Sequence, residues 1–152
     1  MLYTTLKFLH VLLAIIAVGF NATYGLLIAR ARTAGPDARE LRFALRTVKV
    51  MDDYIANPCY VLLLVTGIGM VHTAGLPWSL VWIHGSLALL VAVAVLGFGF
   101  YTPTLRRQIA VLEERGPQDP EFIRLSKRGA ALGGVLGVLV LIIIALMVYK
   151  PA

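Results

Sequence analysis

Histidine is the residue type in this chain that is best suited to chemistry. The sequence has three, His10, His72 and His84, and each lies within or beside a long apolar stretch. The imidazole ring is a good axial ligand for haem iron, and it also binds copper and zinc. An ionisable side chain inside a stretch long enough to cross a membrane indicates function, because lipid disfavours its charged form.

His10 lies on a small, polar side of the first apolar stretch. The members of this side are spaced by four, three, four and three residues, so they share one face of a helix. They are His10, Ala14, Ala17, Asn21 and Tyr24. We expect this face to meet neighbouring helices or a cofactor, and Asn21 to form a hydrogen bond across helices or to a backbone carbonyl.

The composition is that of a membrane protein. The chain has 152 residues, of which 59% are hydrophobic and 14% charged, and a soluble domain cannot bury so much apolar surface. Its formal net charge of +6 would favour a nucleic-acid partner in a soluble protein. Here the basic residues lie between apolar stretches, which indicates membrane topology, with the lipid bilayer as partner and no nucleic-acid binding.

The apolar pattern predicts an all-α fold, an antiparallel bundle of four transmembrane helices, in which residues 1–152 form a single membrane domain. The predicted spans cover about residues 6–29, 54–72, 79–101 and 129–149, and the partly helical loops between them cover 30–53 and 102–128.

Prolines and aspartates mark the ends of two predicted spans. Pro58 lies in the first turns of the second span and is expected to bend it, and Pro103 is expected to end the third. Asp52 and Asp53 precede the second span, and we interpret them as the solvated start of its helix.

The basic residues predict how the chain lies in the membrane. Of the 14 lysines and arginines, all except Lys7 and Lys150 lie in the two predicted loops. The positive-inside rule therefore places both loops in the cytoplasm and both termini on the periplasmic side of a bacterial inner membrane. In that orientation His10, His72 and His84 all lie toward the periplasmic side.

The shared depth of two histidines favours a haem. His10 and His84 lie in different predicted spans at similar depth, so they could clamp a haem between them, with Trp82 beside His84 as a further contact. Ala14 and Ala17 would leave room for it on the His10 side. His72, in the turn after the second span, is a third metal-ligand candidate.

Two alternatives remain open from the residues alone. The three histidines could hold copper or zinc at the periplasmic side. They could also be ordinary interface residues with wet rings, in a cofactor-free structural or accessory subunit. Gly129, Gly133 and Gly137 repeat every four residues, a ridge that allows close helix packing and would serve assembly, including a homo-oligomer.

Four stretches carry a resemblance to known proteins: LKFLHVLLAIIAVG, NPCYVLLLVTG, WIHGSLALLV and MVYKP. Together with the loop RRQIAVLEERGPQDPEFIRLSKR, they make nearly the whole chain resemble a family of small bacterial four-helix membrane proteins of unknown function.

The chain is more distantly similar to HemJ-type protoporphyrinogen oxidases and to the membrane domain of CopD-type copper-resistance proteins. Lys7 and His10 match the Lys-x-x-His of the HemJ pattern, and Trp82 and His84 match its Trp-x-His-x-Lys, in which Ser86 replaces the lysine. The resemblance implies a b-type haem within the helix bundle and His10 as its axial ligand. The replaced lysine, and the lack of histidines at the inner span ends, bear on protoporphyrinogen oxidation rather than on haem binding.

We therefore expect a haem-b membrane protein, with the haem near the periplasmic side, that exchanges electrons with a quinone or a partner protein. If the chain is an enzyme, it is a membrane oxidoreductase. Two histidine ligands would favour electron transfer, and one ligand beside an open iron position would favour oxidation chemistry.

Overall fold

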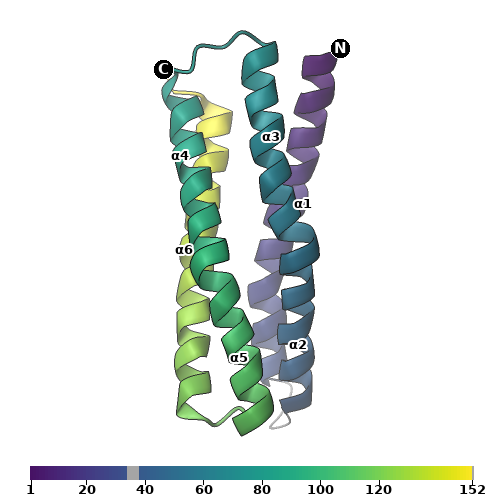
Figure 1. Ribbon diagram of the computed structural model, residues 1–152, viewed down its shortest axis with the longest axis vertical. Coiled ribbons are helices and arrows are strands. Elements are labelled where there is room, and N and C mark those ends of the chain that lie inside the picture. Colours follow the sequence, from purple (N-terminus) through teal and green to yellow (C-terminus); the bar gives the residue numbers. More distant parts are fainter. Residues whose placement is uncertain (34–37, 152) are drawn as a thin grey trace.

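The computed structural model describes residues 1–33 and 38–151, and four long helices make up most of this part of the chain. They run side by side in alternating directions (Figure 1). Their segments are α1 (Leu2–Thr33), then α2 (Ala38–Met51), η1 (Asp52–Ala56) and α3 (Asn57–Thr73), then α4 (Val81–Leu96), η2 (Gly97–Tyr101) and α5 (Thr102–Arg115), and finally α6 (Pro120–Tyr149). The predicted all-α, four-helix architecture is confirmed.

The helices are longer than a bilayer requires. At ~1.5 Å per residue, a helix of the length of α1 extends about 48 Å, whereas a hydrocarbon core is about 30 Å thick. Much of residues 38–53 and 102–128 is accordingly helix, in α2, α5 and the first turns of α6. In α2 the buried residues Leu41, Ala44, Leu45 and Val48 follow helical spacing, which explains why this polar segment folds against its neighbours.

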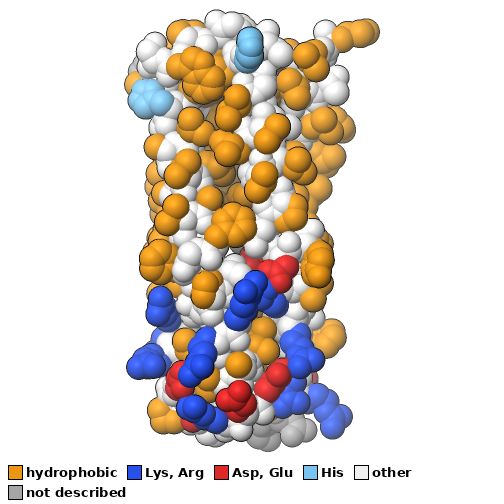
Figure 2. All heavy atoms as spheres, viewed as in Figure 1, with side chains coloured by type: hydrophobic (Ala, Val, Ile, Leu, Met, Phe, Trp, Pro, Cys, Tyr) orange, Lys and Arg blue, Asp and Glu red, His pale blue; other side chains and the backbone are white. Residues whose placement is uncertain are grey.

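The bundle has two halves of different surface character. One end, which we call the charged half, contains α2, α5 and the adjoining ends of α1 and α6, and charged side chains gather on it (Figure 2). The other end, the apolar half, contains α3, α4 and the rest of α1 and α6. Its surface is mainly hydrophobic (Figure 2), as expected of helices that face lipid.

The charged half has a core and an ion-pair network of its own. Leu45, Val48, Val111 and Leu112 are almost completely buried in one cluster. On the outside, three ion pairs join α2 to α5 and α5 to α6: Arg46–Glu113 at 2.6 Å, Arg107–Glu121 at 2.9 Å and Arg115–Glu121 at 2.9 Å. This half is therefore packed like a small soluble bundle.

The apolar half packs mainly as two helix pairs. α1 packs on α3 and α4 packs on α6, whereas α3 and α4 have few contacts with each other. Glycines bring the first pair together: a β-carbon added at Gly67 would lie 3.3 Å from His10 Cε1, and one at Gly69 would lie 3.3 Å from Leu6 Cδ1. Larger residues at these two positions would push α1 away from α3.

Two π-helical segments lie where the halves meet. At the end of η1 the Asn57 N–H donates to the Asp52 carbonyl, and at the end of η2 the Thr102 N–H donates to the Gly97 carbonyl. Each of these hydrogen bonds joins residues that are five positions apart, whereas the bonds of an α-helix join residues four apart. The two segments are level with each other in the bundle, because the Thr102 hydroxyl donates to Asp52 Oδ2 at 2.8 Å.

Each π segment ends two residues before a proline. Pro58 and Pro103 are the second residues of α3 and α5 but lie inside longer continuous helices, so each lacks a backbone N–H that the helix would otherwise use. The wider π turn gives the proline ring more room beside the preceding turn. Pro103, the expected end of the membrane span, is not an end of the helix, which continues through it to Arg115.

Candidate functional site

His10 is held between α1 and α3 by Thr66. His10 Nδ1 lies 2.8 Å from Thr66 Oγ1, and the side chain is partly buried. Thr66 Oγ1 also lies 2.7 Å from the Leu62 carbonyl oxygen, to which it donates its single proton. The Thr66 oxygen therefore accepts the Nδ1 proton of His10, which leaves Nε2 with its lone pair. This is the tautomer in which a histidine binds a metal through Nε2.

The other two histidines lie apart from this contact. His72 is exposed near the end of α3, and His84 is exposed on α4, the helix that packs on α6. Within residues 1–33 and 38–151, no three His, Cys, Asp or Glu side chains come close enough together to hold a metal ion. The structure thus places one predicted ligand inside a helix interface and two on the surface.

The small residues near His10 form the contact between α1 and α3. Ala17 is completely buried in a cluster with Cys59 and Leu63 of α3, and Ala14 packs against the same cluster. Their small size lets the two helices approach each other. Asn21, further along α1, donates its side-chain Nδ2 to Tyr60 of α3 and to the Ala17 carbonyl, so its predicted hydrogen bonding is confirmed.

Trp82 has a neighbour that its sequence position does not reveal. The Lys150 ammonium lies 5.4 Å from the centroid of the Trp82 ring, a cation–π contact between the start of α4 and the residue that follows α6. One turn further along α4, Ser86 is buried, and its hydroxyl has no hydrogen-bond partner in the part of the chain that the structure describes.

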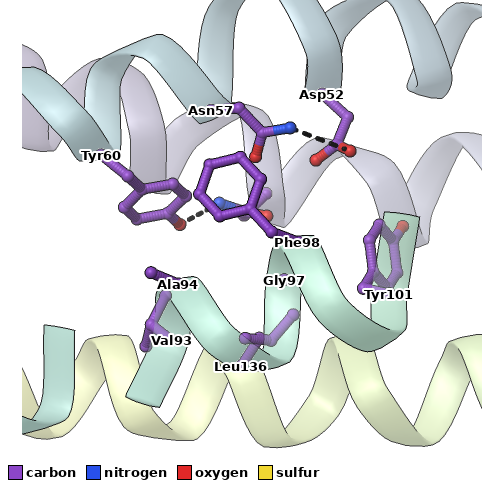
Figure 3. A pocket seen from close by; sticks show the side chains of 10 residues that line it. Asp52, Asn57, Tyr60, Val93, Ala94, Gly97, Phe98, Tyr101 and Leu136 are labelled. Carbon is purple, nitrogen blue, oxygen red and sulfur yellow. Dashed lines mark hydrogen bonds between the residues drawn. The ribbon is translucent and has the colours of Figure 1, made fainter. Parts of the chain in front are cut away.

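A cavity walled by both polar and apolar side chains, at the level of the two π segments, was not predicted from the sequence. All four long helices contribute to its wall (Figure 3), and we call it the junction cavity. Its polar and aromatic lining consists of Asn21, Asp52, Asn57, Tyr60, Phe98 and Tyr101. It offers about 20 Å³ to the centres of water-sized molecules, which is enough for a single water.

Asp52 is the charged residue of the junction cavity and is only 5% exposed. Its Oδ2 accepts hydrogen bonds from the Thr102 hydroxyl at 2.8 Å and from Asn57 Nδ2 at 3.4 Å. Lys49, one turn earlier on α2, pairs instead with Asp53. Among the described residues, no lysine or arginine is within ion-pair distance of Asp52.

The interpretation of Asp52 as a solvated helix start is therefore wrong. The residue is not at a helix start, because α2, η1 and α3 form one continuous helix, and Thr102 of the neighbouring helix covers it. Asp53, next in the chain, is partly exposed, but it lies inside the same continuous helix and is not at a helix start either. Thr102 directly precedes Pro103, whereas Asp52 lies six residues before Pro58, so no shared sequence pattern marks the pair and only the fold brings them together.

The family of the chain follows from comparison with known proteins. A model of the DUF2269 family, described as predicted integral membrane proteins, matches residues 4–151. No curated protein and no solved structure matches the chain. The similarity to HemJ-type oxidases and CopD-type domains thus stays a prediction. Because the match covers nearly the whole sequence, the chain belongs to this family of predicted integral membrane proteins.

Proposed function

We propose that this protein binds a b-type haem through His10 in the apolar half of the bundle and uses it for redox chemistry. The observation that supports this is the hydrogen bond from His10 Nδ1 to Thr66, which fixes the ring and leaves Nε2 for a metal. Ligating histidines in metalloproteins are oriented in the same way by an acceptor on their other nitrogen.

The number of available ligands favours haem over a bare metal ion. A porphyrin supplies the equatorial ligands of its iron, so the protein needs to add only one or two axial side chains. Protein sites for zinc and copper use several side chains that converge on the ion. His10 is one partly buried imidazole without two further His, Cys, Asp or Glu neighbours among the described residues, which suits the haem.

The helix arrangement also suits a flat cofactor. α1 with α3 and α4 with α6 are closely packed pairs, while contacts between α3 and α4 are few. A macrocycle can separate two such pairs at a smaller packing cost than it could separate the members of one pair. When bound, the haem would supply one-electron chemistry, and His10 would hold its iron.

Whether the exposed His84 also binds the iron would distinguish two kinds of redox protein. If His84 is the second axial ligand, the haem carries electrons. If His10 is the only ligand, the iron keeps an open position and the chain is a membrane oxidoreductase.

For the setting, we propose a bacterial inner membrane with both termini and the haem toward the periplasm. The charged half would then lie on the cytoplasmic side, which the concentration of lysine and arginine in that half supports (Figure 2). A quinone dissolved in the bilayer, or a redox protein at its surface, would exchange electrons with the haem.

Absorbance spectroscopy of the detergent-purified protein tests the proposal. The protein is produced in cells supplied with a haem precursor and measured oxidised and then reduced with dithionite. We expect a Soret band, α and β bands that sharpen on reduction, and about one haem per chain. The variant His10→Ala should lose these bands, and the matched variant His72→Ala, at an exposed histidine, should keep them.

Colourless wild-type protein that also fails to take up added hemin would contradict the proposal. Titration with copper and zinc would then test the metal alternative, with His10→Ala again as the comparison. A protein that binds none of these would be assigned to the cofactor-free accessory class.

A further inference from the structure

We propose that the junction cavity binds a small monovalent metal cation of the size of Na⁺, with Asp52 as its charged ligand. The proposal does not rest on haem binding. The cavity lies where η1 and η2 meet, whereas His10 lies deeper in the apolar half beside Thr66.

The described side chains give the buried Asp52 no balancing positive charge. Burying an ionised carboxylate costs free energy unless an opposite charge balances it. Asp52 is 5% exposed, and the donors to its Oδ2, Thr102 and Asn57, are both neutral. The nearest cation along the chain, Lys49, is committed to Asp53. A bound cation would supply the opposite charge that the described side chains do not.

The cavity wall offers side-chain oxygen atoms that could bind a cation. Both hydrogen bonds to Asp52 end on Oδ2, which leaves Oδ1 for a ligand. The amide nitrogens of Asn57 and Asn21 are directed to Asp52 and to Tyr60, so the amide oxygens of both are free of those bonds. Figure 3 shows Asn57, Asp52 and Tyr60 gathered around one space. Oxygen donors without nitrogen or sulfur are the set that hard cations prefer.

The charge of Asp52 and the size of the cavity both favour a small monovalent cation. A single carboxylate balances one positive charge, and a divalent ion would leave an unbalanced charge in a poorly solvated place. The cavity has space for the centre of about one water-sized particle. This space admits a dehydrated Na⁺, which is smaller than a water molecule, and is too small for an organic ammonium group.

A second, independent polar group points to a ligand near the cavity. Tyr24 is 3% exposed, and its hydroxyl has no hydrogen-bond partner within residues 1–33 and 38–151. Tyr24 is not in the cavity wall, but it belongs to the same buried cluster as Tyr101, which is. Buried hydroxyl groups in native proteins are nearly always satisfied, so an unsatisfied one here indicates a bound water or ion.

Thermal unfolding of the full-length protein in detergent tests this site. The melting temperature is measured in NaCl and in choline chloride at equal ionic strength, at constant pH. Because the cation binds the folded state alone, we expect saturating Na⁺ to raise the melting temperature by roughly 5 °C over choline. The dependence on concentration should follow a single binding curve.

Three variants make the test specific. Asp52→Asn keeps the size of the side chain and should abolish the Na⁺ effect. Tyr60→Phe removes the hydroxyl that orients the amide of Asn21, one of the assigned ligands, and should raise the half-saturating Na⁺ concentration by roughly tenfold. Glu114→Gln makes the same change of charge at an exposed position of α5 and should leave the Na⁺ effect intact.

Several results would overturn the proposal. Equal melting temperatures of the wild type in Na⁺ and choline would do so, as would an Na⁺ effect that survives in Asp52→Asn. A melting temperature that changes with pH but not with Na⁺ would assign the balancing charge to a proton on Asp52. If Asp52→Asn does not fold, Tyr60→Phe alone decides, because an unchanged half-saturating concentration contradicts the assigned ligands. Haem spectra recorded in parallel keep the two proposals separate.

Discussion

At the scale of single residues, the chain uses side-chain hydroxyl groups to fix its two polar sites. Thr66 orients His10, and Thr102 links η2 to Asp52. Each hydroxyl acts on another residue's side chain rather than on solvent. Replacing either threonine with valine keeps the shape and removes the hydrogen bond, so the effect of the bond can be measured directly.

Thr66→Val should weaken haem binding without abolishing it. The His10 ring would lose the acceptor that fixes its tautomer, and loss of such an outer partner lowers metal affinity by roughly 10- to 100-fold in other sites. Haem retention on dilution, read from the Soret band, measures the change. Thr73→Val is the control, because its hydroxyl bonds only to carbonyls of its own helix. Equal retention in both variants would contradict the role assigned to Thr66.

Thr102→Val should destabilise the protein by about 1–3 kcal/mol, because it leaves a buried carboxylate with one fewer donor. Chemical or thermal unfolding in detergent measures the loss. Thr104→Val, two residues further along, removes a hydroxyl that donates only to the Phe100 carbonyl of the same helix. We expect this control to lose clearly less, and a comparable loss would show that the link between the π segments contributes little.

At the scale of helices, glycine decides how closely α1 and α3 approach. The space at Gly67 is limited by the His10 ring at 3.3 Å, and that ring is held by Thr66 and cannot easily move. Gly137 of α6, in contrast, has no atom within 4 Å of an added β-carbon. The same substitution at these two positions therefore separates the intrinsic helix preference of alanine from the cost of crowding.

Gly67→Ala should lower the melting temperature or the haem content, and Gly137→Ala should raise the melting temperature slightly. Alanine favours a helix over glycine by about 1 kcal/mol, a gain that Gly137→Ala keeps and that crowding against His10 cancels at Gly67. Thermal unfolding of both variants together measures the difference. A gain at Gly67 equal to that at Gly137 would mean that α1 and α3 separate without cost.

The helices were more predictable than the π turns within them. Long apolar runs with a helical pattern indicated each span, because lipid leaves backbone groups no alternative to internal hydrogen bonds. The passage of the helix through Pro103 was not predicted, since an α-helical pattern does not show where a π turn will accommodate a proline. The burial of Asp52 was missed for a different reason. It depends on Thr102, 50 positions away in the sequence, and no local pattern encodes such a contact.

At the scale of the whole molecule, the distribution of charge predicts one orientation in the membrane. Replacing the single cysteine, Cys59, with alanine provides a background without thiols. In that background Glu40→Cys, in the charged half, should react with a membrane-impermeant maleimide only after the cells are permeabilised. Tyr149→Cys, at the other end of the bundle, should react in intact cells. The opposite labelling would invert the topology and place His10 toward the cytoplasm.

The continuity of the helices has a mechanical consequence. Each of the long helices runs from the charged half into the apolar half without a loop, and two of them contain a π turn at the same level. Stiff rods that cross a boundary carry force along their length. A protein that grips the charged half and tilts or twists it would therefore turn the far ends of the same helices, and the paired π turns, with their wider and weaker bonding, would be the place where that motion bends. The hydrogen bond between Thr102 and Asp52 ties the two helices together at that level.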